Sequence, residues 1–213
     1  MPRHTAVGTP TAARARLSPQ ERRRQLVGIG LRKFVEQPVQ ELSLDEVAAE
    51  AGVSRGLLFH YFPTKTAYHR AVVEAAGRRV LRTVRPDPEL SGEAALGQLV
   101  QRFLDQVARR RDSYLALVFG QVGTLHEGAG EGHADRAGSL REGIAELACA
   151  ALEVDAPASP AVRRAAHGWV AYVEDRALQW SARPAVEQAD RAAGEVAHCV
   201  AALHALVSVP GAP

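Results

Sequence analysis

Helical periodicity runs along almost the whole chain of 213 residues, and it limits the protein to one fold class. Apolar residues recur at three- and four-residue spacing, as they do in a helix that buries one face. Runs that alternate apolar and polar residues, which would indicate strands, are almost absent. Short groups of proline, glycine and serine separate the periodic segments. We therefore predict an all-α fold.

Capping signals place the ends of the expected helices. The sequence SPQE at residues 18–21 has the pattern of a capping box with proline in the first turn, and Pro38 ends this helix. SLDE at residues 43–46 is a second capping box, while Ser54 and Thr64 cap the two helices that follow. After the first helix, we expect helices at about residues 44–51, 55–62, 65–84, 92–111, 113–122, 134–154, 160–182 and 185–207.

Charge is distributed unevenly along the chain, although the net charge is only +2. Residues 1–85 carry 15 Lys and Arg against 7 Asp and Glu, whereas residues 86–213 carry 11 against 17. A basic N-terminal third suits a polyanionic partner, and a solvated surface with chance asymmetry is the alternative. The sequence RPDP at residues 85–88 interrupts the helical pattern where the charge changes sign, so we place a domain boundary there.

Residues 43–65, SLDEVAAEAGVSRGLLFHYFPTK, form the most specific segment. Gly52 stands where a helix ends in a left-handed residue, and Ser54 can cap the next helix. The small side chains of Ala48 and Ala51 allow the two helices to approach closely. This pattern predicts a helix-turn-helix, a unit whose second helix enters the DNA major groove with its N-terminus first.

The same segment resembles the DNA-binding region of the TetR/AcrR transcriptional regulators. AGVSRGLLFHYFPTK follows a helix that ends in LRKF and the segment LSLDEVA, and the resemblance covers roughly residues 22–75. It implies an all-helical homodimer with an N-terminal DNA-binding domain and a larger C-terminal domain for dimerisation and inducer binding. The expected divisions are a flexible basic tail (1–17), the helix-turn-helix domain (18–64), a connecting helix (65–85) and the ligand-binding and dimerisation domain (86–213).

The resemblance also implies which residues face DNA. Arg55 is the best candidate for reading a base, because its guanidinium can donate two hydrogen bonds to guanine; contact with phosphate alone is the alternative. Gly56 lets the backbone approach the groove, and Leu57 either touches a thymine methyl or is partly buried. Tyr61 is expected to bind a phosphate. The expected DNA-binding residues are Ser43, Ser54, Arg55, Gly56, Leu57, His60, Tyr61, Thr64 and Lys65.

Lys65 lies in the first turn of its helix, where the helix dipole disfavours a cation unless a phosphate also binds there. We therefore interpret Thr64 and Lys65 as a phosphate clamp, with simple solvent exposure as the alternative. Two residues depart from the family pattern. Phe59 replaces the usual tyrosine and is expected to pack, and Lys33 replaces an apolar residue and lies either at an exposed edge or against the DNA backbone.

The last two predicted helices carry narrow apolar seams. The spacing in the final helix alternates between three and four residues over three heptads, which favours packing of two helices. Either this seam packs inside one chain, or two such pairs form a four-helix dimer interface; the resemblance favours the dimer, which suits a palindromic DNA site. The expected interface residues are Val162, Ala166, Val186, Ala189, Ala193, Val196, Val200, Leu203 and Val207.

A pocket for an unknown small-molecule inducer is expected among the central helices, where the larger side chains gather. Ordinary core packing is the alternative for most of them, and His167 and Arg176 are the polar groups that could orient a ligand. The candidate pocket residues are Phe103, Val107, Tyr114, Leu117, Phe119, His167, Trp169, Tyr172 and Arg176.

Other classes of function find little support. No nucleophile elbow, zinc-protease motif or phosphate-binding loop occurs, so we expect no enzyme, metal site or cofactor. No membrane span or secretory signal is visible, so we expect a cytoplasmic protein. The sequence therefore favours a ligand-responsive, sequence-specific regulator, more often a repressor in this family, that binds double-stranded operator DNA. A helical small-molecule-binding protein or enzyme with a vestigial helix-turn-helix is the alternative.

Overall fold

The computed structural model describes residues 17–37, 39–118, 134–152 and 158–208, and every regular element in these ranges is helical. The prediction of an all-α fold is therefore confirmed. The elements are α1 (Pro19–Lys33), η1 (Val39–Glu41), α2 (Leu44–Ala51), α3 (Arg55–Tyr61), α4 (Lys65–Val84), α5 (Gly92–Arg109), α6 (Arg111–Val118), α7 (Ala134–Ala151), α8 (Pro160–Ser181) and α9 (Ala185–Ser208). Residues 1–16 of the basic tail, the glycine-rich stretch at 120–133 and the candidate pocket residue Phe119 lie outside the described residues.

Side-chain caps begin most of the helices in the N-terminal half, as the sequence predicts. Ser18 forms a complete capping box with Glu21, and the Ser54 and Thr64 side chains each accept a hydrogen bond from the third residue of their helix. The box expected at residues 43–46 is only half formed, since Ser43 accepts from the Glu46 amide at 3.4 Å but the Glu46 carboxylate binds Lys33 instead. A tertiary ion pair thus replaces the second half of a local cap.

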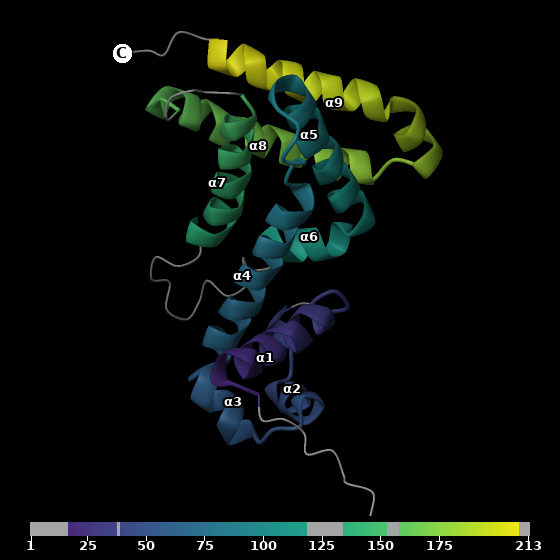
Figure 1. The fold of residues 1–213 in the computed structure, drawn as a ribbon. Helices are drawn as coiled ribbons and strands as arrows, with labels where there is room; N and C mark the ends of the chain where they lie inside the picture. Colours follow the sequence, from purple (N-terminus) through teal and green to yellow (C-terminus); the bar gives the residue numbers. More distant parts are fainter. Residues whose placement is uncertain (1–16, 38, 119–133, 153–157, 209–213) are drawn as a thin grey trace, which may run out of the picture.

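Helices α1, α2 and α3 pack with the first half of α4 into an N-terminal helix-turn-helix domain (Figure 1). Gly30 allows α1 to approach α4 closely, because a Cβ there would lie 2.5 Å from both the Tyr68 hydroxyl and a Val72 methyl. The buried Tyr68 hydroxyl donates a 2.9 Å hydrogen bond to the Leu26 carbonyl, and burial raises the pKa of Tyr68. This contact ties α1 to α4 at the centre of the domain.

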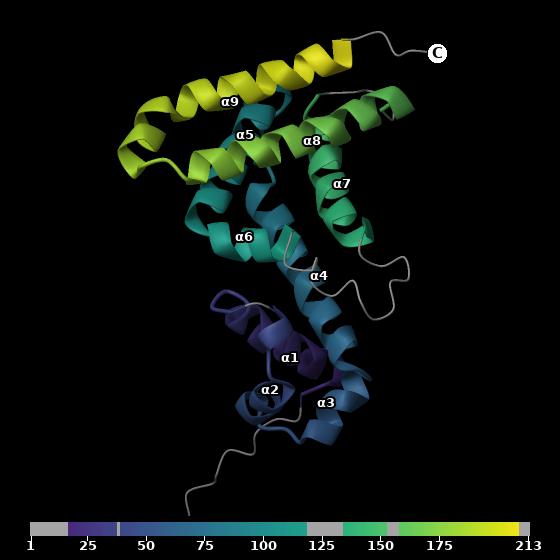
Figure 2. The ribbon, with the colours of Figure 1, turned by 180° about the vertical axis from the view of Figure 1, so that it is seen from behind.

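Helix α4 continues out of the N-terminal domain into the C-terminal helical domain (Figures 1 and 2). There α8 packs against α5, α7 and α9, and both views place α8 and α9 at the end of the molecule opposite to α3. None of the helices in the described ranges combines the length and apolarity needed to cross a membrane. Among the described helices, α4 is therefore the one that belongs to both domains.

Candidate DNA-binding interface and ligand cleft

The turn between α2 and α3 has the geometry expected of a helix-turn-helix. Gly52 adopts the left-handed conformation, with φ 66° and ψ 37°, and its amide donates to carbonyls in the last turn of α2. The Ser54 hydroxyl accepts a 3.2 Å hydrogen bond from the Leu57 amide and so starts α3. Leu58 and Phe62 are buried and anchor α3 on the core, which directs the opposite face of the helix to solvent.

The structure brings most of the predicted DNA-binding residues together on this exposed face. Arg55, Gly56, Leu57 and His60 are exposed, and Tyr61 is half-buried with its ring edge-on to His60. Directly after α3, the residues of the predicted phosphate clamp, Thr64 and Lys65, are exposed at the start of α4, and Ser43 is half-buried at the start of α2. The starts of three helices thus border one surface.

Arg55 is held in place by two side chains. Its Nη1 donates to both carboxylate oxygens of Asp45, at 2.9 and 2.8 Å, and its guanidinium lies 5.5 Å from the centre of the Phe59 ring. Both members of the ion pair are well exposed, with side-chain exposures of 61% and 63%. Only Nη1 binds Asp45, so that carboxylate does not use the Nη2 and Nε donors, which can serve a second acceptor.

Sequence reasoning missed the role of Asp45. A signal was available, since Asp45 and Arg55 both lie in the first turn of their helices, two residues after Ser43 and one residue after Ser54. A helix-turn-helix brings the starts of its two helices near one another, so opposite charges in these first turns can pair. Phe59, which was expected only to pack, is half-buried against the core and also supports Arg55.

The hydroxyls expected to face DNA are already used as helix caps. Ser43, Ser54 and Thr64 accept amide hydrogen bonds at 3.4, 3.2 and 3.0 Å. A hydroxyl that accepts in this way keeps its proton for donation to a phosphate. The Lys65 ammonium donates to the Gln40 carbonyl at 3.0 Å, which holds it beside the preceding segment.

Lys33 connects α1 to α2. Its ammonium lies 3.0 Å from the Glu46 carboxylate and 3.9 Å from that of Glu50, and its side chain is 24% exposed. The hydrogen bond to Glu46 is the main cause that raises the pKa of Lys33. This unusual cation in α1 therefore has partners within the domain.

The residues of the predicted dimer interface fall into two groups. Ala166, Val200 and Leu203 are buried within the single chain, at 0%, 3% and 0% exposure, so they have no surface to offer a partner. Val162, Val196 and Val207 are half-buried, and Val186, Ala189 and Ala193 are exposed. The sequence left open whether the seam packs inside one chain or between two chains. In the structure, Val200 and Leu203 in the second half of the seam pack inside the single chain.

The residues of the predicted pocket are dispersed. Phe103, Val107 and Trp169 are core residues, and the indole of Trp169 donates to the Cys199 carbonyl at 2.7 Å. On the α8–α9 side, Tyr172 pairs with His198 at 2.5 Å, Arg176 binds Glu195 through two hydrogen bonds of 2.5 and 2.6 Å, and His167 is exposed. Among the described candidates, Phe103 and Tyr114 are in ring contact at 5.6 Å, whereas Tyr172 and Arg176 lie on the α8–α9 side.

A cleft of about 450 Å³, including space open to solvent, lies where α1, α4 and α6 meet. Two of the candidate pocket residues, Tyr114 and Leu117, line it. The Tyr114 hydroxyl points away from the cleft to the buried Glu174, to which it donates at 2.5 Å, and Arg141 binds the other oxygen of that carboxylate at 2.5 Å. Burial is the main cause that raises the pKa of Tyr114, so its hydroxyl stays protonated.

Two family models match the chain. The model described as "Bacterial regulatory proteins, tetR family" matches residues 30–77. The model described as "Tetracyclin repressor-like, C-terminal domain" matches residues 93–202, which is just over half of the chain. The first match runs from the end of α1 into α4 and includes α2 and α3, and the second runs from the start of α5 into α9.

Relatives and solved structures agree with these matches. The HTH-type transcriptional regulator SrpR of Pseudomonas putida is 33% identical over 97 residues, which are 46% of this chain and 43% of SrpR, so the chain spans less than half of that relative. The uncharacterized HTH-type transcriptional regulator TtgW, also of Pseudomonas putida, is 33% identical over 97 residues, 46% of this chain and 68% of TtgW. The crystal structure of a tetR-family transcriptional regulator from Streptomyces coelicolor shares the fold, with a TM-score of 0.69 and 24% identity over 91% of this chain and 85% of that one.

The exposed recognition helix and the family matches therefore lead to one conclusion: this chain belongs to the TetR family of DNA-binding transcriptional regulators.

Proposed function

We propose that this chain is a repressor that binds a palindromic operator as a homodimer and releases it when a small molecule binds. The observation that carries the proposal is the exposed face of α3, where Arg55 is held at the helix N-terminus by Asp45 and Phe59. We propose the division of work expected from the sequence, in which residues 18–64 bind DNA, residues 65–85 connect, and residues 86–213 dimerise and bind the ligand.

In this proposal Arg55 reads a guanine through Nη2 and Nε while Nη1 stays on Asp45. Tyr61, Thr64 and Lys65 then bind phosphates on either side, as the sequence suggests. A bidentate contact of this kind contributes about 1–3 kcal/mol of discrimination between bases. Phosphate contacts position the protein without reading sequence and make the affinity fall steeply with salt.

Small side chains on the outer faces of α8 and α9 support a homodimer. Ala171 on α8 and Ala197, Ala201 and Ala205 on α9 are exposed, and a Cβ at Gly168 would meet no atom within 4 Å. Small residues allow the helices of a second copy to approach closely, so we place the dimer contact on these outer faces. Val200 and Leu203 of the seam predicted from the sequence are buried within the chain, so this proposal moves the contact to the neighbouring exposed residues.

Helix α4 is the proposed route from ligand to DNA. It begins at Lys65 beside the DNA-facing surface and ends at Val84 within the C-terminal domain. The two α3 helices of a dimer bind DNA only when their spacing matches that of the DNA groove. A ligand that binds better to dimers with a different α3 spacing lowers operator affinity by the difference between its binding free energies for the two states.

Fluorescence anisotropy with DNA from upstream of its own gene tests DNA recognition. We expect tight, salt-sensitive binding to that duplex, weak binding to a scrambled duplex, and a loss of about tenfold or more for Arg55→Ala on the native duplex alone. Weak binding to both duplexes, followed by failure of a genome-wide site selection to find a preferred sequence, would refute sequence-specific regulation.

Sedimentation velocity tests the dimer. We expect the mass of two chains, and we expect Ala201→Glu to shift the protein toward one chain by placing a charge in the contact. Ala150→Glu changes an exposed alanine on α7 and serves as the matched control. A single-chain mass for the unaltered protein would contradict the homodimer.

A further inference from the structure

We propose that the cleft between α1, α4 and α6 binds a small apolar carboxylate. The inference rests on the proposed ligand response, and it names the place and the chemical class of the ligand. The cleft is distinct from the α8–α9 side of the domain, where Tyr172 pairs with His198 and Arg176 with Glu195.

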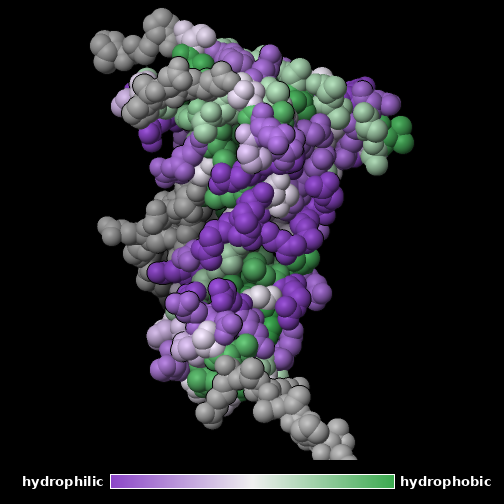
Figure 3. All heavy atoms as spheres, in the orientation of Figure 1, coloured by the Kyte–Doolittle hydropathy of each residue, from purple (hydrophilic) through white to green (hydrophobic). Residues whose placement is uncertain are grey.

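Apolar side chains form the walls of the cleft. Leu31, Phe34 and Val35 line it from the end of α1, Ala76 and Val80 from α4, and Leu117 from α6. Val35 is 43% exposed, although it is a large hydrophobic residue. Figure 3 shows hydrophobic residues at the surface between the two domains, at the level where α1 faces α6 in Figure 1. Such walls favour the apolar part of a ligand.

Two arginines supply the polar part of the site. Arg79 on α4 is exposed, Arg110 between α5 and α6 is half-buried, and both line the cleft. Neither guanidinium forms a hydrogen bond or ion pair with any described residue, whereas Arg102, Arg141 and Arg176 in the same domain are each paired with a carboxylate. None of the described residues that line the cleft is acidic.

This combination selects an anion with an apolar body. A guanidinium binds a carboxylate through two parallel hydrogen bonds, and Gln106 and Ser113 on the same rim offer further polar groups. The volume of about 450 Å³ includes space that is open to solvent, so the enclosed part of the cleft can hold only a small group of a ligand, which favours a small ligand over a long chain.

The cleft lies between the two domains, so a ligand bound in it contacts both of them. α1 belongs to the helix-turn-helix domain and α6 to the C-terminal domain, and across the cleft the Ser113 hydroxyl donates to the Val35 carbonyl at 3.5 Å. A ligand that fills this space prefers one relative orientation of the domains, and by linkage it alters the spacing of the α3 helices in a dimer. Tyr114 on the cleft wall also binds the buried Glu174, which in turn binds the half-buried Arg141.

Isothermal titration calorimetry on the full chain tests the site with three matched pairs of probes. The pairs are benzoate and benzamide, 1-naphthoate and 1-naphthamide, and octanoate and octanamide, in which the amide keeps the shape and removes the charge. We expect at least one acid to bind saturably and its amide to bind about tenfold more weakly or worse, because hydrogen bonds to a charged group are the stronger ones.

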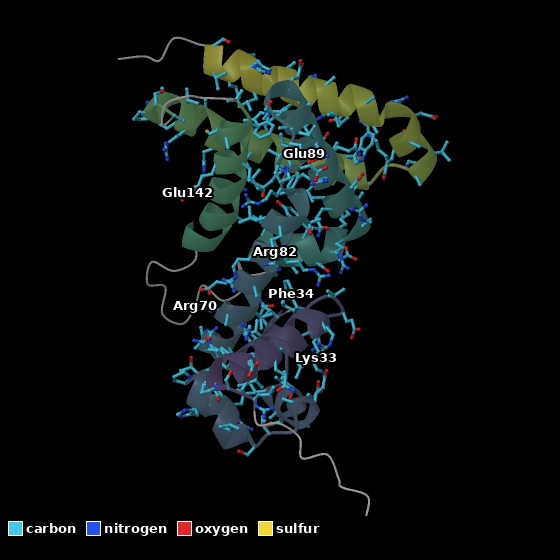
Figure 4. All side chains as sticks on the ribbon, viewed as in Figure 1. Lys33, Phe34, Arg70, Arg82, Glu89 and Glu142 are labelled. Carbon is cyan, nitrogen blue, oxygen red and sulfur yellow. The ribbon has the colours of Figure 1, made fainter. Side chains whose placement is uncertain are left out.

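Three variants locate the binding. Arg79→Gln and Arg110→Gln should each weaken the acid about tenfold. Arg82→Gln is the matched control, since Arg82 is an exposed arginine on the same helix (Figure 4) that does not line the cleft, and it should leave acid binding within about twofold of the unaltered protein. Thermal unfolding followed by circular dichroism confirms that each variant is folded.

The proposal is overturned if no acid binds saturably, if acid and amide bind equally, or if the Arg79 and Arg110 variants bind the acid as well as the Arg82 variant. Operator anisotropy without any probe, with Arg55→Ala beside it, decides the proposed regulator separately. If the cleft variants lose acid binding and the unaltered protein binds its operator, the results support both the site and the regulator. If the unaltered protein binds its operator but no acid, only the proposed ligand site is refuted.

Discussion

The two domains differ in how far the carboxylates of their ion pairs are buried. In the helix-turn-helix domain, Asp45 and Arg55 form an exposed pair beside the surface proposed for DNA. In the C-terminal domain, Glu174 and Glu195 are only 5% and 9% exposed, and each holds an arginine from another helix or segment of the bundle. Exposed pairs contribute about 0–1 kcal/mol and can exchange partners, whereas a buried carboxylate must keep its partners. The first arrangement suits a surface that binds and releases DNA, and the second fixes how the helices pack.

The largest expected effect comes from the buried network. Glu174→Ala removes the acceptor of both the Tyr114 hydroxyl and the Arg141 guanidinium, so it should lower the free energy of unfolding by about 3 kcal/mol. Urea unfolding measures this change. Glu142→Ala, which alters an exposed carboxylate on α7 (Figure 4), should change it by less than about 0.5 kcal/mol. Equal effects from the two variants would remove the contrast between the domains.

Two glycines of α1, Gly28 and Gly30, test what stabilises the helix-turn-helix domain. Gly30→Ala forces a methyl group against Tyr68 and Val72, and we expect it to lower the free energy of unfolding by about 1–3 kcal/mol. Gly28→Ala meets no atom within 4 Å and should raise the free energy of unfolding by about 0.5–1 kcal/mol through helix propensity. Urea unfolding measures whether each variant raises or lowers the free energy of unfolding. A change in the same direction for both variants would refute a close α1–α4 contact.

The exposed pair predicts a change in specificity with little change in stability. Asp45→Asn should alter the free energy of unfolding by less than about 1 kcal/mol, since both partners are exposed. Without the carboxylate, Arg55 loses its fixed position but keeps its guanidinium, so the ratio of operator affinity to scrambled-DNA affinity should fall about threefold, less than the loss of a whole base contact would cause. Glu50→Gln removes a negative charge from the same helix without touching Arg55 and should leave this ratio unchanged; anisotropy on the two duplexes compares the variants.

The smallest expected effect is a pH dependence that arises from His69 on α4. Burial is the main cause that lowers the pKa of His69 from its usual 6.5, repulsion from Lys65 adds to it, and a hydrogen bond to the Leu42 backbone opposes both. The unfolded chain therefore binds more protons than the folded chain just below pH 6.5, so stability is complete above this value and falls as the pH drops through the lower folded pKa.

Urea unfolding across this pH range, compared with His69→Gln, measures the effect. The variant should lose less stability than the unaltered protein as the pH falls. Parallel curves for the two proteins would show that His69 does not carry the dependence.

Local signals in the sequence determine much of the fold. The caps at Ser18, Ser54 and Thr64 and the left-handed Gly52 act within three or four residues of sequence, so the ends of α1, α3 and α4 and the helix-turn-helix could be predicted directly. Arg55 is exposed at the start of α3, and its contact with DNA stays a prediction.

Contacts between distant segments could not be predicted in this way. Glu46 completes a local capping box by spacing, yet its carboxylate binds Lys33 on another helix. Asp45 and Arg55 are only ten residues apart in the sequence, but the angle of the turn between α2 and α3 decides that the Asp45 carboxylate lies against the Arg55 guanidinium. The cleft residues Val35, Arg79 and Arg110 come from three separate segments and share no sequence pattern.

The sequence by itself thus determined that this chain is helical, where its helix-turn-helix lies and which face of each helix is apolar. Only the tertiary structure decided what covers each apolar face: the seam of α9 turns Val200 and Leu203 inward and leaves Val186 to solvent. The physical reason is that periodicity reports burial along one helix, whereas the partner in that burial depends on how helices cross, and the crossing is set by all of their side chains together.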